Sequence, residues 1–306
     1  MGYSDLGERQ ILGRIFLALE ENGPPAWVSD CGMYVTSDQA IETHRGLQAT
    51  PALREWLGGR QAKRLGVDEQ IVVNKRYEAT LEVSRQDLRR DKLGQIQIRI
   101  NELAQRAANH WTKLVTEQIE ANSTTYDGLA FFASGHSGGS NDLDLSASVA
   151  AAGGTPTAAE AEAIVMESLE AMYSLVDDES EPMSMDVSQI TIMVPVNMYG
   201  PFQRALNDAV ITDGSGTRTN TLLNLGGINI RLAVNPRLTS ASKLYVFRSD
   251  RAQKALILQE EVTPKVEVLG EGSDFAFNYD AHQYGISKSC GIANGIWQYA
   301  QRITLS

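Results

Sequence analysis

The longest regular pattern of apolar positions lies between residues 92 and 119. Its apolar side chains recur three or four residues apart: Leu93, Ile96, Ile100, Leu103, Ala107, Trp111 and Leu114. This spacing predicts one amphipathic helix with a single apolar stripe. Asp91 is the expected N-cap. The helix would run roughly 40 Å at the rise of an α-helix, far beyond the average length, and is expected to act as a spine.

A second pattern precedes this helix, because residues 71–83 are rich in β-branched and aromatic side chains and read as strands. In their second half, apolar and polar positions alternate: Tyr77, Ala79, Leu81 and Val83 against Glu78, Thr80 and Glu82. A two-sided ribbon with charge on one face cannot build its own core. We therefore expect residues 67–89 to pack poorly within their own subunit and to be buried by a neighbour.

The rest of the chain mixes helical and strand patterns. Helices are expected at 158–176, where Thr157 is the N-cap, and near 197–208. Strands are expected at 190–195, 228–234, 244–247, 262–268, 274–279 and 284–303, and a flexible loop at 212–217. Residues 1–50 join a short helical pattern to irregular sequence, as in an arm that gains structure by lying on neighbours. Periodicity alone therefore indicates an α+β fold.

Charge is distributed unevenly along the chain. The net charge is −11, which argues against a protein that binds nucleic acid through clustered Lys and Arg. Residues 60–92 nevertheless hold nine Lys and Arg against six Asp and Glu, whereas residues 158–210 hold ten acids and only Arg204 as a base. Two readings stay open: these are ordinary solvated faces, or they are complementary surfaces that guide the assembly of neighbouring subunits.

Several kinds of chemistry have little support. Cys31 and Cys290 are far apart and fit no metal spacing, so buried or idle thiols are expected. The four His residues form no metal-binding pair, no phosphate-binding loop exists, and no cofactor is expected. Apolar runs stay short of the ~18 residues that span a bilayer, and no signal peptide is present. We therefore expect a chain made and kept in the cytoplasm, with no membrane partner.

One short segment hints at an enzyme. Residues 135–139 match G-x-S-x-G, the nucleophile elbow of α/β-hydrolases, with Ser137 as the nucleophile. The elbow needs a strand before the Ser and a helix directly after it, with an acid and then a His later in the chain. Residues 140–144 are a poor helix start, and His282 is the only downstream His. We therefore favour a loop and keep the serine hydrolase as an alternative.

Motifs on both sides of this segment carry a family resemblance. Residues 127–136 form D-G-x-x-F-F-x-x-x-H after a long helix, and residues 284–286 and 297–300 form Y-G-x and W-Q-x-A elements. Residues 77–80, 91–94 and 224–227 add further matches. In these motifs the chain resembles the major head proteins of Mu-like tailed phages, the gpT family, from about residue 50 to its end.

The resemblance implies the tailed-phage major capsid (Johnson) fold. Its parts would be an N-terminal arm (1–50), an extended loop of β-ribbon (51–91), a peripheral domain with the spine helix (92–157), an axial domain (158–261) and C-terminal strands of the peripheral domain (262–306). It also implies a shell protein and no enzyme: hexamers and pentamers that form the icosahedral head around double-stranded DNA. A compartment shell like the encapsulins is the alternative with the same fold.

Partners follow from the same resemblance. They would be other copies of the chain, a separate scaffolding protein, a portal and decoration proteins, with DNA enclosed but not bound by sequence. The chain is not expected to be trimmed at its N-terminus. Trp56 is the first candidate for a contact between subunits, because aromatic residues beside Arg are enriched where interfaces bury their centres. The complete candidate set is Trp56, Arg60, Tyr77, Arg85, Arg89 and Arg90.

Overall fold

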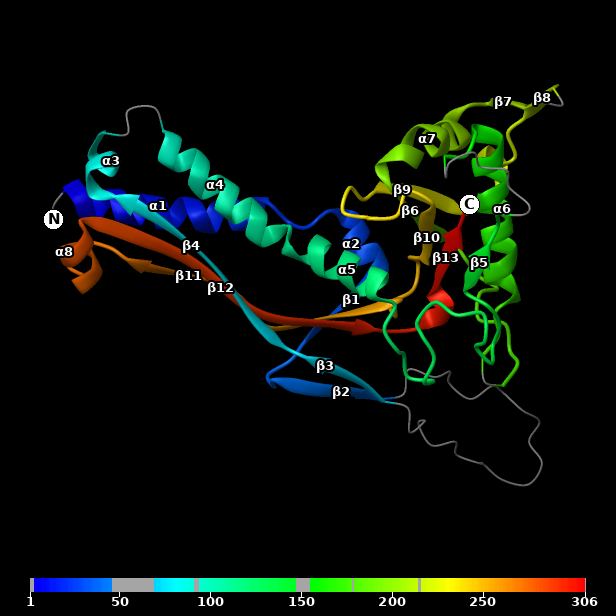
Figure 1. Cartoon of the computed structure of the whole chain (residues 1–306), viewed down its shortest axis with the longest axis horizontal. Helices are drawn as coiled ribbons and strands as arrows, with labels where there is room; N and C mark the ends of the chain where they lie inside the picture. Colours follow the sequence, from blue (N-terminus) through cyan, green and yellow to red (C-terminus); the bar gives the residue numbers. More distant parts are fainter. Residues whose placement is uncertain are drawn as a thin grey trace.

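The computed structural model describes residues 3–45, 69–90, 94–146, 155–177, 179–213 and 216–305. The molecule is elongated, with a long four-stranded sheet in one half and a five-stranded sheet at the other end (Figure 1). Helices α1 (Tyr3–Glu21) and α4 (Gln95–Ala108) run along the first sheet, and α6 (Ala158–Ser174) and α7 (Tyr199–Asn207) lie beside the second (Figure 1). The expected α+β class is confirmed.

The four-stranded sheet has the order β1-β11-β12-β4, built from Gly32–Thr36, Leu256–Leu269, Ala281–Asn294 and Lys75–Ser84. β1 runs parallel to β11, and the other pairs are antiparallel. In β4 the expected alternation is present, since Val83 is buried while Glu82 is exposed. β4 nevertheless pairs with β12 along its whole length. The expectation that residues 67–89 lack a partner within their own subunit is therefore wrong for β4, because a strand distant in sequence supplies it.

The first half of the expected ribbon forms a separate hairpin-like pair. β2 (Ile41–Arg45) and β3 (Glu69–Val73) are antiparallel, with Arg45 opposite Glu69. Val72 is fully buried in a small cluster with Ile257 and Ala293. A Cβ on Gly291 would lie 2.7 Å from the Val73 carbonyl oxygen, so a glycine is needed where β12 passes this ribbon. The β2–β3 ribbon is thus packed through β3 on strands β11 and β12 of its own subunit.

The expected spine is two helices. α4 (Gln95–Ala108) and α5 (His110–Ala121) are separated at Asn109, whose backbone has φ −78° and ψ 4°. The Asn109 carbonyl oxygen accepts both the N–H and the hydroxyl of Thr112, at 3.1 and 2.7 Å, which starts the second helix. Gly94, in the left-handed region, precedes α4, and Asp91 lies outside the described residues. The break lets α5 bury Trp111, Leu114 and Ile119 in the main core.

The N-terminal segment differs from the expected arm. α1 (Tyr3–Glu21) packs beside α4, and Ile15 is fully buried with Ile100 and Tyr284 against the four-stranded sheet. α2 (Ala26–Cys31) places Trp27 and Val28 in the main core, and β1 follows directly. These residues therefore contribute to the subunit's own hydrophobic cores.

The five-stranded sheet has the order β5-β13-β10-β6-β9, built from Asp142–Asp144, Ala300–Thr304, Lys243–Arg248, Gln189–Val194 and Asn229–Val234. α6 (Ala158–Ser174) begins at a capping box in which Thr157 and Glu160 bond reciprocally, which confirms Thr157 as the predicted N-cap. α7 (Tyr199–Asn207) follows the short helix η2 (Val196–Met198). Apolar side chains of α6 and α7, such as Ile164 and Phe202, pack in one core with Ile192 of the sheet.

Local predictions failed at two places. Residues 274–279 were expected as a strand but form helix α8, because the Ser273 hydroxyl accepts the Ala276 N–H and caps it. Residues 212–217 were expected as a flexible loop, but 212–213 and 216–217 lie in the paired strands β7 (Val210–Asp213) and β8 (Gly216–Thr219), and residues 214–215 lie outside the described residues. The remaining elements are α3 (Arg85–Arg90), η3 (Leu222–Asn224) and η4 (Trp297–Tyr299).

The two sheets also divide the chain differently from the expected boundaries. β13 lies in the five-stranded sheet although 262–306 was assigned to the other domain, and the start of β11 lies in the four-stranded sheet although 158–261 was assigned to the axial domain. One core joins both sheets, since Phe247 of β10 and Leu256 of β11 share it with Trp111 and Trp297. Cys31 and Cys290 are buried free thiols, as expected.

Candidate functional site

The motif residues of the resemblance come together in space where the two sheets meet. His136 is 5% exposed and stacks on Trp297, with ring centroids 4.0 Å apart and planes 10° apart. Its Nδ1 lies 2.5 Å from Asp127 Oδ2, and its Nε2 lies 3.3 Å from the Phe131 carbonyl oxygen. We call this group, Asp127, Phe131, His136 and Trp297, the motif cluster. It ties the segment after α5 to the C-terminal segment.

Backbone groups of the motif cluster are held by asparagines that the sequence did not single out. Asn141 is fully buried, and its Nδ2 donates to the carbonyl oxygens of Phe131 and Trp297, at 2.8 and 3.1 Å. Its Oδ1 accepts the Ala133 N–H at 3.0 Å. Asn122, in the left-handed conformation that ends α5, accepts the Phe132 N–H at 2.7 Å. Only their position within ten residues of the F-F pair in the sequence could have pointed to them.

The aromatic pair extends the motif cluster into the five-stranded sheet. Phe131 and Phe132 meet edge to face with centroids 4.8 Å apart, and Phe132 lies 5.4 Å from the ring of Tyr245 in β10. A Cβ on Gly138 would lie 2.1 Å from the Val176 carbonyl oxygen, so the chain after α6 passes directly against this turn. The arrangement is a packed joint between the two halves of the subunit.

Ser137 does not have the geometry of a hydrolase nucleophile. It is exposed on a tight turn in which the Gly139 N–H donates to the His136 carbonyl oxygen at 3.2 Å. The next element in the chain is the strand β5 and not a helix. His282 lies in β12 opposite Val83, in the four-stranded sheet. The residues expected for the alternative enzyme are therefore not brought together.

The structure describes the side chains of three of the six candidate contact residues. Tyr77 is partly buried on β4, and its ring lies 4.3 Å from the ring of His110. Arg85 forms ion pairs inside its own subunit, with Glu271 and with Asp280. Arg90 is exposed at the end of α3.

The other three candidates are less defined. Trp56 and Arg60 lie outside the described residues, as does the side chain of Arg89. The structure thus gives Arg85 a structural role and leaves Arg90 and Tyr77 accessible.

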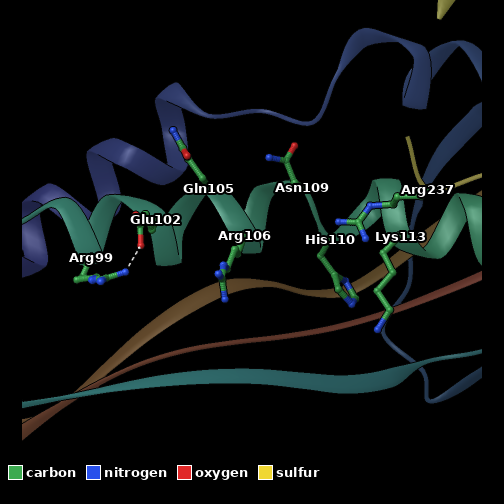
Figure 2. A pocket seen from close by; sticks show the side chains of 8 residues that line it. All are labelled: Arg99, Glu102, Gln105, Arg106, Asn109, His110, Lys113 and Arg237. Atoms are coloured by element: carbon green, nitrogen blue, oxygen red, sulfur yellow. Dashed lines mark hydrogen bonds and ion pairs between the residues drawn. The ribbon is translucent and has the colours of Figure 1, made fainter. Parts of the chain in front are cut away.

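A basic hollow along the spine was not expected from the sequence. It encloses about 610 Å³ beside α4 and α5 and is lined by Arg99, Glu102, Gln105, Arg106, Asn109, His110, Lys113 and Arg237. Figure 2 shows Arg99, Arg106, His110 and Lys113 pointing to the same side of the two helices, with Arg237 arriving from another segment. Among these lining residues Glu102 is the single acid, and it pairs with Arg99 at 3.0 Å. We call this surface the basic groove.

Its electrostatic character is visible at His110. Burial, followed by the positive charges of Lys288, Lys113 and Arg237, lowers the pKa of His110 to about 4. Arg237 is fixed because its Nε donates to Thr112 Oγ1 at 3.2 Å and its N–H donates to Asn235 Oδ1 at 3.0 Å. The groove therefore presents an excess of positive charge on a rigid support.

Two classes of site find no support among the described residues. No cluster of His, Cys, Asp and Glu in this part of the chain has the composition to hold a metal ion. None of the described helices is both long and apolar enough to span a membrane.

Comparison with known proteins places this geometry in context. Residues 11–161 match the family model described as Mu-like prophage major head subunit gpT. The Mu-like prophage FluMu major head subunit of Haemophilus influenzae is 30% identical over 119 residues, which cover 38% of this chain and 39% of that protein. The major capsid protein of Escherichia phage Mu is 29% identical over 114 residues, covering 37% of each. Each match thus spans less than two fifths of the relative's length.

The fold extends the likeness to the whole chain. A subunit in the procapsid of bacteriophage JBD30 superposes with a TM-score of 0.57 and 20% identity, covering 100% of this chain and 77% of that chain. At this level of identity the superposition establishes the fold. Over residues 11–161 this chain matches the gpT family of Mu-like prophage major head subunits, and its fold is that of the tailed-phage capsid proteins.

Proposed function

We propose that this chain is the major capsid protein of a Mu-like tailed phage, assembling as hexamers and pentamers into the icosahedral shell that encloses double-stranded DNA. The observation that carries the proposal is the match of residues 11–161 to the head subunit family. The same match favours a phage head over an encapsulin-like compartment. The family also favours a structural role over catalysis, and the exposed turn at Ser137 agrees with that.

The work of such a protein is mechanical. Two sheets joined by the motif cluster form an elongated, stiff subunit, which can transmit load between contacts at its two ends. We assign the four-stranded sheet with the spine to the peripheral domain and the five-stranded sheet with α6 and α7 to the axial domain. Residues 46–68 would be the part of the extended loop that reaches a neighbour, through Trp56 and Arg60.

Exposed apolar side chains support association. Phe277 is 89% exposed and Tyr279 is 68% exposed, both on α8 at the end of the β11–β12 hairpin, and Met185 is 74% exposed beyond α6. Large apolar side chains left in water at the ends of a subunit are typical of surfaces that become buried by a partner. Other copies of the chain, a scaffolding protein, a portal and decoration proteins are the partners we propose, and the virion is the location.

Expression of the chain with electron microscopy of the purified product tests this proposal. The expected result is closed particles of uniform diameter built from rings of six and five subunits. Particles that contain enzyme cargo instead of DNA, when purified from phage-producing cells, would favour the compartment. A chain that stays monomeric at high concentration and in the presence of the other head proteins would contradict a shell function.

A further inference from the structure

The basic groove has the properties of a docking surface for a charged partner. Arg99 and Arg106 lie seven residues apart on α4, Lys113 follows on α5, and all three side chains point to one side of the two helices (Figure 2). Arg237 adds a fourth positive charge from outside the spine. Because the walls are helices held in two cores, the charges stay in place without a partner.

A second surface of the same chain has the complementary chemistry. Along the outer side of α6, Met166 and Tyr173 are 41% and 42% exposed, although both are large apolar side chains. Glu167 and Glu170 lie between them on the same helix, and Glu170 is exposed. Exposed Met and Tyr are residue types enriched at protein interfaces, and acids beside them suit a partner surface of positive charge. We call it the α6 acidic face.

Overall charge favours pairing these two surfaces. Each copy carries a net charge of −11, so copies repel one another on average. A concave surface with four bases and one acid is where an acidic surface of another copy gains most from Coulomb attraction. The Tyr173 ring also offers a face on which a guanidinium of the groove can stack.

We propose that the basic groove of one copy binds the α6 acidic face of a second copy. This inference rests on the proposed function, because it names one of the contacts by which the shell would form. Nucleic acid is the other anionic occupant to consider. The average charge of the chain opposes it, and its binding is made an outcome of the test below.

Charge exchange provides the first test. Arg106→Glu with Lys113→Glu should abolish particles while the subunit stays soluble and folded by circular dichroism. Glu167→Lys with Glu170→Lys should do the same, and the four substitutions together should restore particles. Arg204→Glu with Lys265→Glu, which reverses two exposed bases elsewhere, is the matched control and should assemble as the wild type does.

Cross-linking provides the second test and does not depend on closed particles. Gln105 lines the groove and Ser174 is exposed at the end of α6, so the double variant Gln105→Cys, Ser174→Cys should give dimers and longer chains with a short bismaleimide. The native Cys31 and Cys290 are buried and should not react. Each single variant, and Gln105→Cys paired with Gln203→Cys on α7, serve as controls and should stay uncross-linked at the same concentration.

The outcomes separate this inference from the proposed function. If the wild type assembles and the groove variant also assembles, the inference is overturned and the shell function stands. If the groove variant assembles but its particles lose their DNA, the groove binds nucleic acid and the inference is likewise overturned. If the wild type never assembles, the shell function fails. The cross-link between Gln105→Cys and Ser174→Cys then decides the contact by itself.

Discussion

At the scale of single residues, the motif cluster shows what the side chains of the sequence motifs do in this chain. His136 uses one face and both nitrogens of its ring: it stacks on Trp297, faces Asp127 with Nδ1 and faces the Phe131 carbonyl with Nε2. No aliphatic side chain can supply both the flat contact and the polar one. The histidine is therefore a structural residue, and its neighbour Ser137 only forms the turn.

His136→Ala should lower the free energy of unfolding by about 3 kcal/mol, because it removes a stacked aromatic pair and takes the His136 partner away from Asp127 Oδ2. Denaturant unfolding followed by circular dichroism measures this. Ser137→Ala is the control, since its side chain is exposed, and it should alter neither unfolding nor particle formation. A loss of less than about 0.5 kcal/mol for His136→Ala would mean that the stack adds little to stability.

The basic groove predicts a pH dependence through His110. Because the pKa of His110 falls from its ordinary value of 6.5 to about 4 on folding, the unfolded chain binds more protons between these values. Stability attributable to this residue should therefore decrease as the pH falls from 6.5 towards 4. The loss should be roughly 1 kcal/mol after allowing for screening by water at this partly exposed ring.

Unfolding of the wild type and of His110→Gln at pH 7 and pH 4.5 measures this linkage. The variant should lose less stability than the wild type over that interval, since Gln does not titrate. Equal losses in the two proteins would assign the acid sensitivity to carboxylates elsewhere.

At the scale of elements, the close approach of two segments decides which residues a position tolerates, even where secondary-structure propensity would allow many. The turn at residues 136–139 lies against the segment that leaves α6, where the Val176 N–H donates to the Gly138 carbonyl oxygen at 3.0 Å. There is no space for a side chain at Gly138, whereas a Cβ on Gly135 would meet nothing within 4 Å. A larger residue can therefore replace Gly135 but not Gly138, although both glycines belong to the same short motif.

Gly138→Ala should destabilise the subunit by about 3 kcal/mol, because the new Cβ would press on a backbone oxygen that cannot turn away. Gly135→Ala is the matched control and should change the free energy of unfolding by less than about 0.5 kcal/mol. Thermal unfolding of both variants beside the wild type gives the comparison. Equal behaviour of the two would show that the turn moves freely away from α6.

Element by element, the sequence was most informative where stability is local. The capping box of α6 and its buried positions Ile164, Leu169 and Met172 agree with the predicted helix, because cap and stripe are both encoded within one segment. The break at Asn109 and the helix α8 were missed. The break depends on the hydrogen bond of Thr112, and α8 depends on the hydrogen bond to Ser273. Such local bonds outweigh the periodic apolar pattern only when the surrounding side chains have packed.

At the scale of the whole molecule, the subunit consists of two sheets that share one core. The ribbon β2–β3 projects beside this core, and the chain leaves it at Arg45 and returns at Glu69 (Figure 1). These two residues are partners in the antiparallel register and form an ion pair of 2.6 Å. A short turn could therefore replace residues 46–68 without moving either strand.

Replacing residues 46–68 with Asn-Gly should keep the subunit folded, with the free energy of unfolding within about 1 kcal/mol of the wild type, since a shorter loop costs little entropy to close. Particle formation should be lost, because Trp56 and Arg60 are removed together. Circular dichroism and electron microscopy provide the two measurements.

Trp56→Ala with Arg60→Ala is the companion variant and should reduce particle yield in the same direction. Normal particles from the shortened chain would remove these residues from the proposed contact set. An unfolded product would instead show that residues 46–68 stabilise the subunit itself.

The sequence by itself determined the α+β class, the main helices, most strands and the family resemblance, because these follow from periodicity, caps and motifs contained in short segments. Tertiary structure alone decided the pairing of β4 with β12, the packing of α1 on α4 and the burial of charged Arg248 between Asp186 and Asp250. It also decided the meeting of Asn141 with Trp297, which are 156 positions apart. Such contacts depend on where distant segments arrive in space, and a single sequence records their residues without recording their distances.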